Sequence, residues 1–155
     1  MINNVYFNNY YEDKNFFNIS TSIYKNLPEN IDVFSELNDV SGKVSEYTRK
    51  SYNRLMETIK RYIDMRDSIY PLENNLSKLK NYIDDDKEIF IEWIVRNNFR
   101  IGFDIDKNGN ISFWKIYKNG TSTNTISDCI EESKFEEQIA SLINEVMNLT
   151  WLIQI

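Results

Sequence analysis

Residues 88–118 constrain the fold more than any other part of the chain. Apolar and polar residues alternate over three segments, and the pairs Asn97-Asn98 and Asn108-Gly109 separate these segments. A period of two residues is typical of β-strands, and Asn-Gly is a preferred pair in tight hairpin turns. The stretch therefore predicts three consecutive antiparallel strands. Asn119-Gly120 predicts a further turn, and Thr121–Ser127 predicts a short fourth strand.

The first predicted strand differs from the others because its apolar residues occupy both faces. Between Ile89 and Val95 only Glu92 is polar. A strand that is apolar on both faces is typical of the interior of a sheet. The second strand alternates cleanly, with Phe99, Ile101, Phe103 and Ile105 on one face and Arg100, Gly102 and Asp104 on the other.

Before the predicted strands, the apolar period changes from two residues to three or four. Between Ser41 and Ile69 this spacing predicts one long helix, which begins near Ser41 or Ser45. An earlier, shorter helix is predicted from Pro28 to about Leu37, because proline suits the first turn of a helix.

Pro71 predicts the end of the long helix, because proline cannot continue the hydrogen bonding of a helical backbone. Apolar residues recur at helical spacing after it, which predicts another helix. The apolar face of that helix comprises Leu72, Leu76, Leu79, Tyr82 and Ile83.

The C-terminal part of the chain predicts one more helix. Ser133 and Glu136 have the spacing of a capping box, and an apolar stripe of Phe135, Ile139, Leu142, Ile143, Val146 and Met147 follows. The predicted fold is one α+β domain over residues 1–155. Its N-terminal helices lie mainly in residues 1–87, and residues 88–155 hold a three- to four-stranded antiparallel meander and a C-terminal helix packed on the sheet.

The composition excludes several kinds of active site. The chain has no histidine and a single cysteine, Cys129, so it cannot form a Ser-His-Asp triad, a Cys-His pair or a zinc site that needs imidazole. Acidic pairs such as Glu92 and Asp104 can face each other across strands, but no nucleophile and base accompany them. We therefore expect a protein that is not an enzyme and has no cofactor.

One stretch resembles a calcium-binding loop. Asp104, Asp106, Asn108 and Gly109 match the first, third, fifth and sixth positions of an EF-hand loop. The twelfth position is Lys115, where such a loop requires a glutamate, and the flanking residues alternate as strands do. The stretch therefore predicts a hairpin turn, and no metal is expected there.

Two clusters of acidic residues are candidate partner-binding sites. The net charge is −6, from 24 acidic and 18 basic residues. The clusters comprise Asp84, Asp85 and Asp86, and Glu131, Glu132, Glu136 and Glu137. Such clusters favour rapid association with a basic protein surface, for example that of a complex that binds nucleic acid.

The predicted long helix offers a different surface. One of its faces is basic and comprises Arg49, Lys50, Arg54, Lys60 and Arg61. An alternative hypothesis is therefore an accessory protein that binds nucleic acid through this face, within residues 43–66. The simpler interpretation is a solvated helix face with internal ion pairs.

The sequence also bears on location. No signal-peptide pattern begins the chain, and no apolar stretch approaches the ~20 residues that a membrane-spanning helix needs. A single cysteine suits a reducing compartment. We expect a cytoplasmic protein that does not enter a membrane.

Residues 88–147 resemble small uncharacterised bacterial and phage proteins. The resemblance rests on Glu92-Trp93, on Arg100-Ile101-Gly102-Phe103 and on the Asn-Gly hairpin. It implies a small accessory protein from a mobile element and brings no active site with it. The expected function is a non-enzymatic protein-protein binding module. Its specific form would be a phage inhibitor of a host defence complex that targets nucleic acid.

Overall fold

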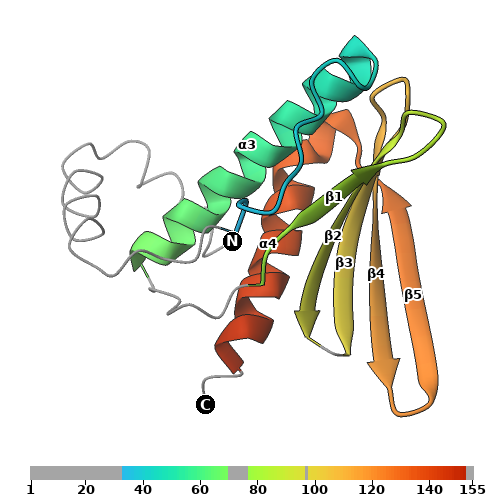
Figure 1. The fold of residues 1–155 in the computed structure, drawn as a ribbon. Coiled ribbons are helices and arrows are strands. Elements are labelled where there is room, and N and C mark those ends of the chain that lie inside the picture. Colours follow the sequence, from blue (N-terminus) through green and yellow to red (C-terminus); the bar gives the residue numbers. More distant parts are fainter. Residues whose placement is uncertain (1–32, 70–76, 97, 153–155) are drawn as a thin grey trace.

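The computed structural model describes residues 33–69, 77–96 and 98–152. In this part of the chain, a five-stranded antiparallel sheet carries two long helices on one of its faces (Figure 1). The α+β class predicted from the sequence is confirmed. The arrangement differs in detail, because the described part has one helix before the sheet and one after it, and the sheet has five strands.

The strands follow one another in space as they do in sequence. They are β1 (Lys80–Ile83), β2 (Ile89–Arg96), β3 (Phe99–Ile105), β4 (Ile111–Asn119) and β5 (Ser122–Cys129), in the order β1-β2-β3-β4-β5. Each neighbouring pair is antiparallel, so the sheet is a meander. The three predicted strands and the predicted fourth one correspond to β2, β3, β4 and β5.

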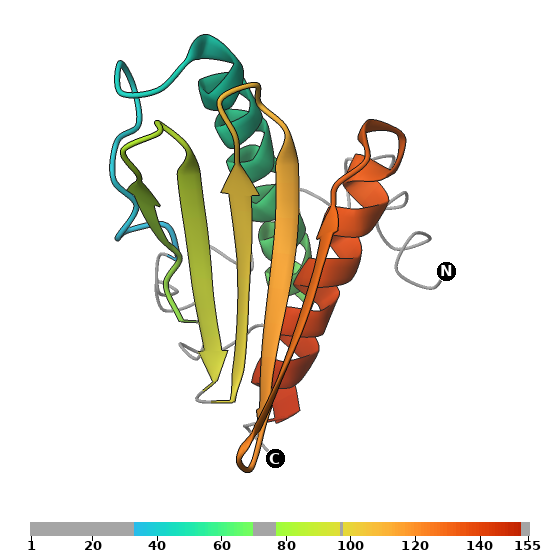
Figure 2. The ribbon, with the colours of Figure 1, turned by 90° about the vertical axis from the view of Figure 1, so that its right-hand side faces the viewer.

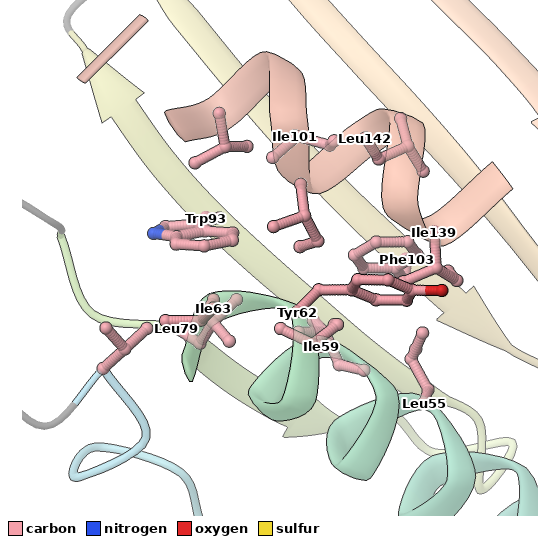
Figure 3. Packing of buried hydrophobic residues seen from close by; sticks show 14 of the residues in the cluster. Leu55, Ile59, Tyr62, Ile63, Leu79, Trp93, Ile101, Phe103, Ile139 and Leu142 are labelled. Carbon is pink, nitrogen blue, oxygen red and sulfur yellow. The ribbon is translucent and has the colours of Figure 1, made fainter. Parts of the chain in front are cut away.

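The two helices pack on the same face of the sheet. Helix α3 (Glu46–Ile69) confirms the predicted long helix, and α4 (Phe135–Leu152) follows a 3-10 turn at Glu132–Lys134. Figure 1 shows both helices on the same side of the strands, and in the turned view of Figure 2 both lie behind them. The core between the layers joins side chains from the two helices and from β2 and β3 (Figure 3), among them Leu55, Ile59, Trp93, Ile101, Phe103, Ile139 and Leu142.

The predicted helix over residues 72–83 is wrong where the structure describes it. Residues 80–83 form strand β1, and residues 72–76 lie outside the described residues. Asn81 is buried whereas its neighbour Tyr82 is 59% exposed, which is the alternation of a strand. The spacing of Leu79 and Ile83 fits a helix and a strand equally well, and pairing with the edge of β2 decides between them.

The predicted helix from Pro28 to Leu37 is also wrong for its described part. Residues 33–36 form turns, and residues 28–32 lie outside the described residues. The backbone of this segment bonds to the residue before β1 instead, because the Leu79 amide donates to the Val33 carbonyl at 2.9 Å. Asn38 and Asn81 add three further hydrogen bonds through their side chains. The segment thereby covers the outer edge of β1.

The start of α4 differs from the predicted capping box. Ser133 lies in the middle of the 3-10 turn that precedes α4 and not at the position directly before the first helical residue, Phe135. The carboxylate of Glu136 accepts hydrogen bonds from Arg61 and from the Tyr62 hydroxyl on α3. This side chain therefore joins the two helices.

Three hydroxyl groups at the start of α3 fix the helix to the turn between β3 and β4. Ser45 Oγ donates to Lys107 O at 2.8 Å, Thr48 Oγ1 to Asp106 O at 2.8 Å, and Ser51 Oγ to Gly109 O at 2.6 Å. The donors are three residues apart, which places them on one face of the helix. The result is a contact between segments about 60 residues apart in sequence.

Candidate binding surface

The second face of the sheet has no covering element in the described part of the chain. Figure 2 shows the strands in front of the helices from this side. Alternation along the strands and their register decide which side chains lie here. This open face comprises Lys80 and Tyr82 from β1, Phe90, Glu92 and Ile94 from β2, Arg100, Gly102 and Asp104 from β3, Ser112, Trp114, Ile116 and Lys118 from β4, and Thr123, Thr125, Ser127 and Cys129 from β5.

A pair of stacked rings lies at the β1 side of the open face. Tyr82 and Phe90 are opposite each other in the register of β1 and β2. Their ring centroids are 5.0 Å apart and their planes differ by 11°. Stacking holds both rings in place, and 59% of Tyr82 remains exposed. This pair is therefore a rigid aromatic contact surface.

Trp114 lies flat on the neighbouring strand because residue 102 is glycine. A Cβ atom at Gly102 would lie 2.0 Å from Cζ2 of Trp114, so no other residue leaves room for the indole. The indole Nε1 donates a hydrogen bond to Asp104 Oδ1 at 3.2 Å. The position and the orientation of the ring are thus both set by β3.

Charged groups lie between the rings. Burial raises the pKa of the Asp104 carboxyl group, although the hydrogen bond from Trp114 acts in the opposite direction. Glu92 forms an ion pair with Arg100. The Arg100 Nε atom is buried and has no hydrogen-bond partner among the described residues. Glu92 and Asp104, which the sequence allowed as an acidic pair, share this face but bind different partners.

The acidic cluster at Asp84–Asp86 forms the turn between β1 and β2. The Glu88 amide donates to Asp84 Oδ1 at 2.9 Å, and Lys87 has a φ of 65°, which closes the turn. Asp85 and Asp86 are exposed. Because the turn directly follows β1, these carboxylates lie beside the stacked rings at the border of the open face.

The second acidic cluster is partly neutralised within the molecule. Glu132 binds Arg54 through both carboxylate oxygens, at 2.7 and 2.8 Å. Glu136 binds Arg61 at 2.6 Å. Glu131 lies 3.6 Å from the Nζ of Lys134, and Glu137 is exposed.

Figures 1 and 2 show where the two acidic clusters lie. The turn after β1 and the segment that leads from β5 into α4 are at the same end of the sheet. In Figure 2 they are at opposite sides of that end, with the turn between β3 and β4 between them. The structure therefore leaves the predicted acidic residues as two separate patches.

The same ion pairs neutralise part of the charge on the predicted basic face of α3. Arg54 and Arg61 are engaged by α4 and the turn before it, and Lys50 lies 3.2 Å from Glu46 on its own helix. Arg49 and Lys60 are exposed. The interpretation as a helix face with ion pairs describes this surface better than a continuous stripe for phosphate.

The stretch that resembles a calcium loop is a hairpin turn, as predicted. The Asp106 amide and the Asn110 carbonyl close the turn at 3.0 Å, and Gly109 has a φ of 84°. The Asp106 carboxylate accepts hydrogen bonds from the Asn108 and Asn110 amides. Across the described residues, no three acidic or cysteine side chains are grouped so that they could hold a metal ion.

No described helix is both long and apolar enough to span a membrane.

Comparisons with models of protein families, with curated proteins and with solved structures gave no match.

Sequence reasoning placed the aromatic residues on strands but did not identify the surface that they form. The signal was present in β2, where Phe90 and Ile94 make the second face apolar. That pattern predicts a strand inside a sheet, and β2 does have a neighbour on each side. It does not show that both helices cover the same face, and this decides which rings stay accessible.

Proposed function

We propose that this chain is a non-enzymatic protein-binding module that meets its partner through the open face of the sheet. The observation that carries the proposal is the set of ordered aromatic side chains there. Tyr82 is stacked on Phe90, and Trp114 is held against Gly102. Ordered rings bind with little loss of conformational entropy, so they are favourable contact residues.

The composition of the face favours a protein as the partner. Tyrosine, tryptophan and arginine are the residues most often found at the energetic centres of protein interfaces. Ile94 adds an exposed apolar side chain, with 40% of its surface accessible. A face that binds single-stranded nucleic acid would combine rings with a basic groove, whereas Glu92 and Asp104 accompany Arg100 here.

The acidic turn at Asp84–Asp86 indicates the charge of the partner. It borders the stacked rings, and the whole chain carries a net charge of −6. A basic patch on the partner would be attracted to this border, which increases the rate of association. Binding to a basic surface of a defence complex that targets nucleic acid is the specific form of this function. That form rests on the resemblance of residues 88–147 to phage proteins.

The test compares two exposed tyrosines. The tagged chain is used to isolate a partner from the host cell, and affinity is then measured with the purified partner. Tyr82→Ala is expected to weaken binding about tenfold or more, as loss of an interface hot spot does. Tyr47→Ala is the matched control, because Tyr47 is 71% exposed on α3, away from the open face. Equal affinities of the two variants would contradict the proposal.

Charge reversal tests the acidic border. Asp85→Lys combined with Asp86→Lys should slow association and make it less sensitive to salt. The alternative hypothesis gives another outcome: the purified chain would bind DNA or RNA, salt would weaken that binding, and Arg49→Ala with Lys60→Ala would abolish it. That result would favour nucleic-acid binding instead, provided that the Tyr82→Ala variant binds nucleic acid as tightly as the unchanged chain does.

A further inference from the structure

Strand β5 forms an edge of the sheet, and among the described residues only its last one, Cys129, has its outward backbone groups bonded to side chains of the chain. It is the last strand in the sheet order, so β4 lies on one side and the described residues place no strand on the other. All eight of its side chains are exposed. Soluble proteins usually protect such an edge with lysine, proline or a bulge. The sequence of β5, STNTISDC, has neither lysine nor proline, and its pairing with β4 has a continuous register.

The backbone groups available for pairing can be assigned. The amide of Ile130 donates to Ile111 O at 2.8 Å, in line with the register of β4 and β5. Alternate residues of a strand direct their N–H and C=O groups to opposite sides. The groups of Thr123, Thr125, Ser127 and Cys129 therefore point away from β4. Those of Cys129 are already bonded within the chain, to Asp128 Oδ1 and to Gln138 Nε2, so Thr123, Thr125 and Ser127 are the residues available for pairing.

The side chains of β5 complement those of a second, antiparallel copy. A two-fold axis perpendicular to the sheet keeps the helices of both copies on the same side. With the axis at Ile126, that residue meets its own copy, and it is 49% exposed in the single chain. Asp128, the only charged residue of β5, then lies opposite Asn124 of the second copy, and Thr125 lies opposite Ser127. No like charges of β5 face each other across the pair.

The distribution of charge over the whole chain also suits this arrangement. The acidic cluster at Asp84–Asp86 and residues Glu131 and Glu132 lie at one end of the sheet (Figures 1 and 2). Antiparallel pairing places the acidic end of one copy next to the opposite end of the other. That opposite end carries the turn between β4 and β5 and the exposed Lys118. Parallel pairing would bring the acidic ends together.

From these observations we propose that the protein forms a homodimer through antiparallel pairing of β5 with β5 of a second copy, centred on Ile126. The two sheets join into one continuous sheet. This inference does not depend on the proposed function, because the edge of β5 is a different surface from the open face.

The first test measures the mass of the full chain by sedimentation equilibrium over a range of concentrations. The expected mass is twice the 18.6 kDa of one chain. Ile126→Lys places two like charges at the axis, and Thr125→Pro removes an outward amide without taking a hydrogen bond from β4. Each variant should raise the dissociation constant of the dimer about tenfold or more. Asn53→Lys, on the exposed side of α3, makes the same change of charge as Ile126→Lys and should leave the dimer intact.

A disulfide cross-link tests the register. In a background with Cys129→Ser, the substitution Ile126→Cys should yield a covalent dimer on mild oxidation, because directly opposite residues have Cα atoms about 4.5–5.5 Å apart. Asn124→Cys, on the same face, lies opposite Asp128 of the second copy and should cross-link poorly. A monomer at every concentration would overturn the proposal. So would a dimer that both Ile126→Lys and Thr125→Pro leave unchanged, since it would then use another surface.

Discussion

Gly109 shows how one residue can join the sheet to the helix layer. Its φ of 84° lies in the left-handed region, which residues with a Cβ atom adopt only with strain. Its environment adds a second requirement, because a Cβ atom there would lie 2.8 Å from Ser51 Oγ and from the Tyr47 carbonyl oxygen. The left-handed φ belongs to the hairpin turn and can be predicted from Asn108-Gly109 in the sequence. The close approach follows from the packing of α3 against the turn and cannot be predicted in this way.

Gly109→Ala should therefore destabilise the protein more than a left-handed conformation alone explains. Gly120 is the matched control, because its φ is 63° and a Cβ atom there would have no neighbour within 4 Å. We expect Gly120→Ala to cost about 1 kcal/mol and Gly109→Ala about 2–3 kcal/mol of unfolding free energy. Urea denaturation measures both. Equal losses would mean that the turn moves away from α3 without cost.

The partial burial of Asp104 in the folded state disfavours the charged form of its carboxyl group. Burial raises its pKa above the usual range, so the folded state holds a proton more strongly than the unfolded state does. Stability therefore falls as the pH rises from the unfolded pKa through the folded pKa, and it stays lower at neutral pH. Asp104→Asn removes the charge and keeps an oxygen that can accept from Trp114.

Asp104→Asn should raise the melting temperature at neutral pH by about 1–3 °C. The difference should disappear once the pH falls below the usual pKa of aspartate. Asp106→Asn should act in the opposite direction. Burial alone would raise the pKa of Asp106, but hydrogen bonds from the turn outweigh it and lower the pKa. Thermal melts of both variants over a pH series distinguish these effects. If both substitutions changed the melting temperature at neutral pH in the same direction, this account would be contradicted.

At the scale of elements, some strands can be predicted from the local sequence pattern, whereas others depend on tertiary contacts. The period of two residues and the Asn-Gly turns predicted β2, β3 and β4, because their register depends on neighbours in sequence. Strand β1 was predicted as a helix, because its order depends on contacts with residues far away in sequence. The Asn81 side chain, which is buried, donates to Asn38 O and to the Tyr52 hydroxyl. These partners lie 43 and 29 residues away.

The contact between α3 and the β3–β4 turn gives a test at this scale. Thr48 is fully buried and donates to Asp106 O, in another element. Thr58 is also buried but donates to Arg54 O, within its own helix. Thr48→Val should cost about 1–2 kcal/mol, since it leaves a partly buried acceptor without this donor. Thr58→Val should cost less, because the helix can satisfy that carbonyl. The reverse order in urea denaturation would contradict the role given to Thr48.

The ion pairs between α3 and α4 make part of the stability depend on pH. Burial alone would raise the pKa of Glu136, but hydrogen bonds from Arg61 and Tyr62 outweigh it and lower the pKa. The folded state therefore releases this proton more easily than the unfolded state. The resulting stability is present above the unfolded pKa and is lost as the pH falls through the folded pKa.

Glu136→Gln should lower stability at neutral pH by about 0.5–1 kcal/mol, a small value because both side chains of the pair are partly exposed. The wild type and the variant should converge in acid. A second measurement is the alkaline titration of Tyr62, whose pKa is raised to about 12 by burial and by the hydrogen bond to Glu136. The variant should titrate at lower pH. An unchanged Tyr62 titration would show that Glu136 does not hold this hydroxyl.

At the scale of the whole molecule, the candidate surface depends on which face of the sheet the helices cover. The sequence predicted an apolar stripe on α4, and all its members are buried. It did not predict that α3 lies on the same side, which leaves Tyr82, Phe90 and Trp114 outside the core. The acidic and basic clusters can be read from the sequence, but the ion pairs of Arg54 with Glu132 and of Arg61 with Glu136 depend on the packing of the helices.

The coverage of β1 limits how large an assembly of this sheet can become. A sheet that is open at both edges can add copies without end and form a fibre. Here Asn38 bonds to Asn81 of β1 and Val33 to Leu79 just before it, so pairing through β5 uses the remaining edge of each copy within the described residues. Growth then stops at two chains, and the assembly is a closed particle with two-fold symmetry. Removing this cover, for example with Asn38→Pro, should let the proposed dimer grow into longer species that light scattering detects.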